Sequence, residues 1–116
     1  MATSTIKGTA TEVINLTVSS LTHLARVDNP KVYRKGNVGL LSFDMVNTTT
    51  DLAKGSSASF NLSGLPTLVA PVKIVGYSGN TPIICSVTQT TVSARITGTD
   101  WVKNYNCVCE GIILFE

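Results

Sequence analysis

The residue types best suited to chemistry gather in one segment near the end of the chain, where Asp100, Trp101, Asn104 and Tyr105 stand close together. Indole and phenol rings stack on the apolar faces of sugars, while carboxylate and amide groups exchange hydrogen bonds with hydroxyls. This mixture predicts a contact site for a saccharide or for a polar protein surface. The alternative interpretation is that Trp101 only closes the open end of a β-fold.

Three cysteines, Cys85, Cys107 and Cys109, are the next candidates. An odd number argues against a complete set of disulfides. Cys107 and Cys109 stand two residues apart in an expected strand, so their side chains share a face but are too distant to bond readily. A zinc site would need a fourth ligand, and the only histidine, His23, is distant in sequence. We therefore expect buried, reduced thiols, with neither a metal ion nor a cofactor.

The familiar catalytic motifs are absent from the sequence. It has no Gly-x-Ser-x-Gly elbow, His-Glu-x-x-His motif, phosphate-binding loop or dinucleotide fingerprint. The acidic residues include no close pair that suggests a glycosidase dyad. We therefore expect a protein without enzymatic activity. His23, among apolar neighbours, is either a ligand contact or an ordinary hydrogen-bonded histidine of a strand.

Charged residues make up only 14% of the sequence, against a usual quarter or so. Such sparse charge predicts that identical subunits cover part of the surface. The alternative is that Ser, Thr and Asn replace charge as the polar cover. The net charge of +2 is scattered without a basic stripe, which argues against nucleic-acid binding.

The sequence also argues against a membrane protein. No apolar run approaches the ~18 residues of a membrane span. The first residues, Met-Ala-Thr-Ser-Thr, lack the basic and apolar regions of a signal peptide. We therefore expect a soluble protein that is not exported by that route.

The elements that must position these residues are short strands. Apolar and polar residues alternate throughout the chain, as in residues 58–62, and glycine or proline separates the segments. Alternation with a period of two marks half-buried strands. Asp28-Asn29-Pro30 predicts a turn. We expect strands at residues 11–18, 21–27, 31–34, 38–46, 57–62, 72–77, 82–88, 91–97 and 107–116.

This pattern predicts one all-β domain over residues 1–116, an antiparallel β-sandwich or jelly-roll-like barrel of about eight or nine strands. A chain of 116 residues is long enough for a single modest core. The last expected strand is apolar on both faces from Ile112 to Phe115. Such a strand lies at the centre of a sheet or at a subunit interface.

From Lys31 onward the chain resembles the C-terminal head domains of phage tail receptor-binding proteins and tail-fibre tips. The segment KVYRKGNVGLLSFDMV resembles their hairpin, with a basic-aromatic strand, a glycine turn and an apolar strand. The segment LAKGSSASFNLSGLPTLVAP is similar to their crossing segment. The segment VSARITGTDWVKNYNCVCEGIILFE resembles their closing pattern of strand, Trp-bearing loop and apolar strand.

The resemblance implies a homotrimeric head of the phage virion, joined to other virion structural proteins at the tail. It implies adhesion to saccharides or proteins of the host cell surface, with Trp101 as the aligned aromatic residue. Three linked sites would turn weak contacts into useful avidity. Two alternatives stay open: a virion decoration or capsid-associated assembly protein, and a carbohydrate-binding module of a secreted enzyme.

Overall fold

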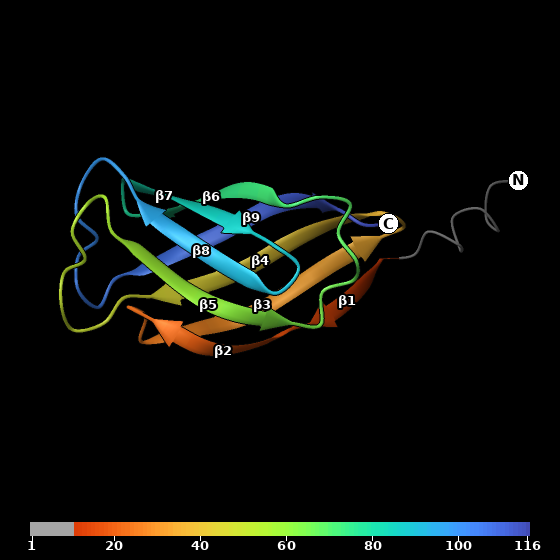
Figure 1. Ribbon diagram of the computed structural model, residues 1–116, viewed down its shortest axis with the longest axis horizontal. Coiled ribbons are helices and arrows are strands. Elements are labelled where there is room, and N and C mark those ends of the chain that lie inside the picture. Colours follow the sequence, from red (N-terminus) through yellow and green to blue (C-terminus); the bar gives the residue numbers. More distant parts are fainter. Residues whose placement is uncertain (1–10) are drawn as a thin grey trace, which may run out of the picture.

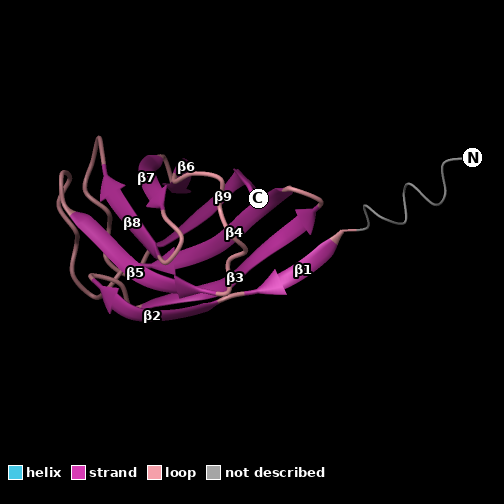
Figure 2. Cartoon of the chain, turned by 45° about the vertical axis from the view of Figure 1, so that its right-hand side comes forward, coloured by secondary structure: helices cyan, strands magenta, loops and turns pink. Residues whose placement is uncertain are grey.

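The computed structural model describes residues 11–116, which form a barrel-like all-β fold with no helix in this part of the chain (Figure 2). The expected antiparallel β-fold is confirmed. Its strands are β1 (Glu12–Asn15), β2 (Thr17–Thr22), β3 (Arg26–Lys35), β4 (Val38–Val46), β5 (Ser57–Ser63), β6 (Val72–Ser78), β7 (Thr81–Val87), β8 (Thr91–Ile96) and β9 (Asn106–Leu114).

All nine strands belong to one sheet, in the order β1-β3-β4-β9-β6-β7-β8-β5-β2, and every neighbouring pair is antiparallel (Figure 1). Strands β6, β7 and β8 form a meander, and β5 returns to lie beside β8, as in a Greek key. The last strand, β9, lies between β4 and β6. This central position agrees with one of the two places expected for a strand that is apolar on both faces.

The sheet nearly closes because one extended segment supplies both of its edges. Strand β1 pairs with β3, whereas β2, which follows after a single residue, pairs with β5. The residue between them, Leu16, is buried, and its N–H donates to the carbonyl oxygen of Pro30 at 2.9 Å. The strand expected over residues 11–18 is therefore wrong as one element, because the chain changes partners at Leu16.

The turn expected at Asp28-Asn29-Pro30 is also wrong, because β3 runs through it as one strand of 10 residues. Asp28 faces Asp44 and Lys31 faces Ser42, so β3 carries one extra residue between these pairs. This is a β-bulge. Asn29 has a φ of 51°, a left-handed conformation that asparagine tolerates better than most residues. The strand expected at 31–34 therefore extends back through the bulge to Arg26, whereas the strand expected at 21–27 is wrong as one element, because the chain turns at residues 23–25 between β2 and β3.

The barrel interior holds the apolar residues of the alternating strands. Phe43 of β4 and Phe60 of β5 meet edge to face, with ring centroids 5.4 Å apart. Burying such residues is the main source of stability in a small domain. The largest fully buried side chains are Trp101, Phe43, Phe60, Phe115, Leu41, Met45, Leu62, Ile83, Ile96, Ile113, Val32 and Val87.

The three cysteines are buried, as expected, and no disulfide joins them. The Sγ atoms of Cys85 and Cys107 each lie 3.6 Å from Sγ of Cys109. The Sγ atoms of Cys107 and Cys109 lie against Gly76 of β6, where an added Cβ would overlap Cys109 Sγ and lie 2.7 Å from Cys107 Sγ. Hydrogen bonds of the Cys109 thiol with Cys107 and Cys85, together with burial, raise the pKa of Cys109 far above its ordinary value.

Candidate functional site

The four residues singled out in the sequence lie in or at the end of the loop between β8 and β9, at one end of the barrel. This loop is paired with the loop between β4 and β5. Leu52 and Trp101 exchange two backbone hydrogen bonds, of 2.9 and 2.8 Å. The Trp101 side chain is 0% exposed. Its ring belongs to the core and presents no face to solvent.

The other three residues have separate roles. The carboxylate of Asp100 accepts the Lys54 N–H at 2.9 Å, which ties the two loops together. Asn104 has a φ of 62°, and its backbone N–H donates to the Thr48 carbonyl at 2.8 Å. Tyr105 is 55% exposed. Of the four, Tyr105 is the aromatic residue that an outside ligand can reach.

A buried asparagine that the sequence analysis did not single out organises this end of the barrel. The side-chain amide of Asn47 donates to the carbonyls of Trp101 and Val102 at 2.9 and 3.2 Å. Its side-chain oxygen accepts the Thr48 N–H at 2.8 Å. Asn47 therefore holds the Trp101 loop in place from the inside.

His23 lies in the turn between β2 and β3 and not within a strand, with a φ of 58°. Its ring Nδ1 lies 3.0 Å from the Ser57 carbonyl oxygen, to which it donates. This bond joins the turn to the start of β5. The structure thus assigns His23 a hydrogen bond within the fold.

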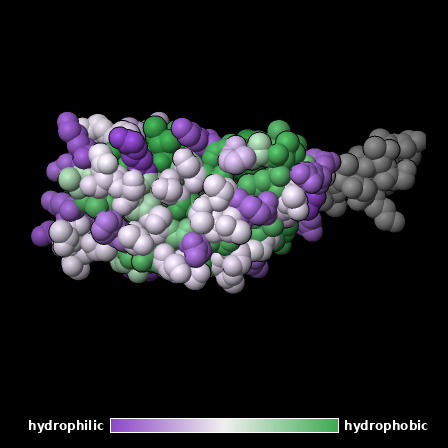
Figure 3. Space-filling model, viewed as in Figure 1, coloured by the Kyte–Doolittle hydropathy of each residue, from purple (hydrophilic) through white to green (hydrophobic). Residues whose placement is uncertain are grey.

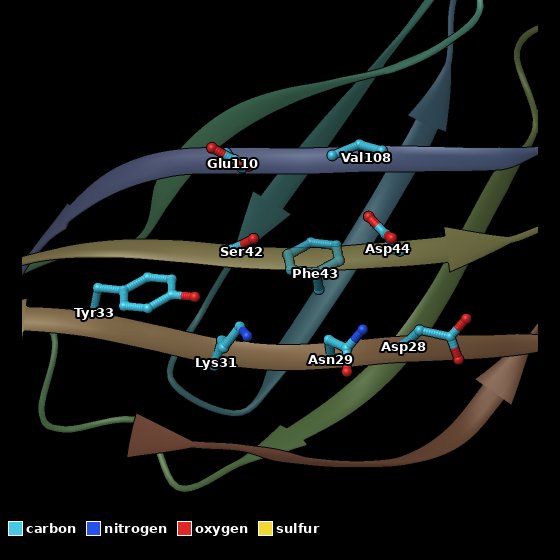
Figure 4. A pocket seen from close by; sticks show the side chains of 9 residues that line it. All are labelled: Asp28, Asn29, Lys31, Tyr33, Ser42, Phe43, Asp44, Val108 and Glu110. Carbon is cyan, nitrogen blue, oxygen red and sulfur yellow. The ribbon is translucent and has the colours of Figure 1, made fainter. Parts of the chain in front are cut away.

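A second candidate site lies on the outer face of the sheet, where β3, β4 and β9 form a groove of about 320 Å³ (Figure 4). Cross-strand register explains its composition, because outward residues of neighbouring strands stand opposite one another. Lys31, Ser42 and Glu110 form one such row. The groove is lined by Asp28, Asn29, Lys31, Tyr33, Ser42, Phe43, Asp44, Val108 and Glu110.

The β3 bulge lies at this groove. The extra residue falls between the Asp28–Asp44 and Lys31–Ser42 pairs, next to Phe43 of β4. A bulge bends its strand and increases the local twist. Phe43 itself is buried, with its ring toward the core. The groove therefore forms where β3 departs from regular pairing with β4.

The groove is rich in carboxylates. Asp28, Asp44 and Glu110 contribute one each, from three different strands. Asp28 accepts the Arg26 Nε–H at 3.0 Å in an exposed ion pair, which contributes little to stability. The carboxylates of Asp44 and Glu110 have no ion pair within the described residues. They are thus free to accept hydrogen bonds from a ligand.

Tyr33 and Lys31 form the other half of the groove. Lys31 Nζ lies 5.5 Å from the centre of the Tyr33 ring, in a cation–π contact. Tyr33 is partly exposed. An aromatic ring therefore stands beside hydroxyl, ammonium and carboxylate groups, a mixture that suits polyhydroxylated ligands.

Neither the described residues nor the comparisons with known proteins indicate a site beyond the loop and the groove. Between residues 11 and 116, no cluster of three or more His, Cys, Asp or Glu side chains could hold a metal ion. No helix of this part of the chain is long and apolar enough to cross a membrane. No family model, curated protein or solved structure matches the chain.

The groove was not predicted from the sequence. Most of its residues occupy outward positions in three alternating segments, KVYRK, SFD and VCEG, and Asp28 and Asn29 precede the first of them. That signal shows which side chains face solvent. It does not show that β9 pairs with β4 across more than 60 residues of chain, which is what brings Glu110 beside Ser42.

Proposed function

We propose that this protein is a non-catalytic receptor-binding head that adheres to a saccharide through the groove on β3, β4 and β9. The observation that carries the proposal is the convergence of Tyr33, Asp44 and Glu110 on one exposed groove. Carboxylates accept hydrogen bonds from neighbouring sugar hydroxyls, and a tyrosine ring packs against the apolar face of a sugar. The carboxylates favour neutral or amino sugars over acidic ones, because like charges repel.

The proposed setting is the tip of a phage tail fibre, where the head joins other virion structural proteins and acts at the host cell surface. The resemblance of three segments to tail receptor-binding heads supports this setting. We propose a homotrimer, which carries three grooves. Linked sites raise the avidity for a cell surface without any new contact in a single site.

The loop at the end of the barrel stays a second proposed contact. Since Trp101 is buried, ligand stacking there would depend on Tyr105, which is exposed. Loops held on a rigid β-scaffold commonly carry recognition. The groove and this loop therefore make separate, testable claims about where the receptor binds.

A virion decoration or assembly protein is the second candidate function. It is favoured by the outward apolar residues of β9, among which Ile112 and Leu114 are more than half exposed. A protein that only assembles would need such a surface but would bind no glycan.

A glycan array of bacterial surface saccharides tests the proposal, with binding of labelled protein to host cells as a second readout. We expect wild-type protein to bind a neutral or amino sugar. Tyr33→Ala and Glu110→Gln should each weaken binding by roughly 30-fold, the effect of losing an anchor worth about 2 kcal/mol. Both residues are at the surface, so both variants should keep the wild-type melting temperature.

Two matched variants in the loop complete this experiment. If the groove is the site, Tyr105→Ala and Asn104→Ala should bind like wild type. Loss of binding in these two, with normal binding in the groove variants, would move the site to the loop. A wild-type protein that binds neither glycans nor cells would overturn the receptor-binding proposal.

A further inference from the structure

An apolar surface covers one end of the same outer face. Ile112 and Leu114 of β9 are 60% and 54% exposed, and they stand opposite Leu40 and Val38 of β4. Val69 adjoins them, since its N–H donates to the Leu114 carbonyl at 3.1 Å. We call these residues, Val38, Leu40, Val69, Ile112 and Leu114, the apolar band. Figure 3 shows further apolar residues at the same end of the barrel, on the side of β5 and β8, which is the side in view; the outer face of β4 and β9 is turned away.

Within the apolar band, Ile112 and Leu114 of β9 form a ridge, and a hollow lies on each side of this ridge. On one side, a hollow of about 300 Å³ lies between residues 69–72 and residues 112–114. On the other side, a hollow of about 440 Å³ is lined by Tyr33, Val38, Leu40 and Ile112, among others. Each is larger than the ~150 Å³ protein cavity that holds a benzene molecule. Each can therefore receive a branched aliphatic side chain such as those of the ridge itself.

The charged residues on the two sides of the apolar band have opposite signs. Lys35 stands opposite Val38 at the end of β3, and Lys31 lies further along the same strand. Glu110 precedes the ridge on β9, and Glu116 follows it. The β3 side is thus basic and the β9 side carries acidic residues. A head-to-tail contact between two copies would bring opposite charges together, which favours correct association.

We infer that copies of this chain associate through the apolar band, with the Ile112–Leu114 ridge of one copy entering the hollow beside Val38 and Leu40 of the next. The two hollows have different linings, so the contact joins unlike surfaces. Contacts between unlike surfaces close into a ring when the rotation allows it. This inference rests on the homotrimer in the proposed function, and it does not depend on the saccharide ligand.

The proposed contact lies beside the polar groove. Tyr33 lines both the groove and the larger hollow. A ring built through the apolar band therefore places one groove next to each boundary between copies. Rotation about a single axis would relate the grooves, so all of them would face the same end of the ring, as simultaneous adhesion requires.

Light scattering of the full chain at micromolar concentration tests this inference. We expect wild-type protein to have about three times the monomer mass of 12.3 kDa. Ile112→Asp should give the monomer mass while keeping a β-type circular dichroism spectrum, because the side chain points outward. The matched control is Val102→Asp, which changes a different exposed aliphatic residue, in the loop at the other end of the barrel. It should keep the wild-type mass.

Cross-linking keeps the inference testable if Ile112→Asp fails to fold. Ile112→Cys and Leu40→Cys are introduced into separate chains that are coexpressed, because the two residues are cross-strand partners and would bridge within one copy if a single chain carried both. The mixture should form disulfides between copies on oxidation, whereas Val102→Cys should not. A monomeric wild-type protein would overturn the inference, as would an Ile112→Asp variant of unchanged mass or an absence of cross-links. A monomeric Ile112→Asp variant should still bind saccharide at its groove, with reduced avidity for a surface. Failure of the saccharide proposal can therefore be distinguished from failure of the association proposal.

Discussion

At the scale of single residues, the thiol cluster makes stability depend on pH. Folding raises the pKa of Cys109, because the hydrogen bonds that its thiol makes with Cys107 and Cys85, together with burial, favour its neutral form. Below the unfolded-state pKa of 9.0 the Cys109 thiol is protonated in both the folded and the unfolded chain, and its full contribution to the free energy of unfolding is present. At higher pH the unfolded chain loses a proton that the folded chain keeps, so stability falls as pH rises.

We therefore predict that the free energy of unfolding decreases above a pH of about 9, by about 1.4 kcal/mol per pH unit for one such group. Urea unfolding at several pH values between 7 and 11 measures this slope. Cys109→Ala is the control, since it removes the titrating group, and its slope should be smaller by that amount. Equal slopes for the two proteins would contradict this role of Cys109.

The same cluster explains why residue 76 is a glycine. Any side chain there would meet Cys109 and Cys107, whose Sγ atoms occupy the space. We predict that Gly76→Ala lowers the free energy of unfolding by about 1–3 kcal/mol, as overpacking of a core does. In a Cys109→Ala background the same change should cost less, because the nearest obstructing atom is gone. A double-mutant cycle in urea measures the difference, and additive effects would refute the explanation.

At the scale of elements, the bulge in β3 shapes the groove. It places Asn29 at a φ of 51°, which β-branched residues strongly disfavour. We predict that Asn29→Val costs about 1–2 kcal/mol of stability, whereas Asn29→Gly, the matched control, is nearly neutral. Thermal unfolding compares the two. An Asn29→Val variant as stable as Asn29→Gly would show that the bulge does not fix this conformation.

The strands that local alternation predicted well are those that keep one pair of partners over their length. Residues 38–46, 57–62 and 72–77 were expected, and β4, β5 and β6 match them closely. Local alternation cannot show where a strand changes partners, as at Leu16, because both halves stay extended. Asp28-Asn29-Pro30 suits a turn and a bulge equally, since an asparagine that tolerates positive φ can serve in either.

The candidate sites differ in how much of each could be predicted from the sequence. The alternating pattern predicted the buried thiols, because Cys107 and Cys109 stand at inward positions of one strand. The Trp101 loop stood out by composition, and closure of the end of the fold by Trp101 was one of its two interpretations. The sequence did not show that Asn47 and Leu52 would fix the Trp101 backbone. The groove depends on pairing between β4 and β9, which lies beyond any local pattern.

At the scale of the whole molecule, the two proposed contact surfaces lie along one outer face. Polar residues around Glu110 and Tyr33 form the groove proposed to bind a receptor. Further along the same strands, Ile112 and Leu114 form the ridge proposed to join copies. A single sheet thus positions both surfaces at a fixed spacing, which suits a protein that works by avidity.

The most direct test of the central claim is nuclear magnetic resonance of isotopically labelled protein during titration with neutral and amino sugars. The account predicts saturable shifts of the backbone amides of Lys31, Tyr33 and Glu110, with little change at Tyr105. Shifts confined to residues 97–105, or no shifts with any sugar, would contradict the groove as the receptor site.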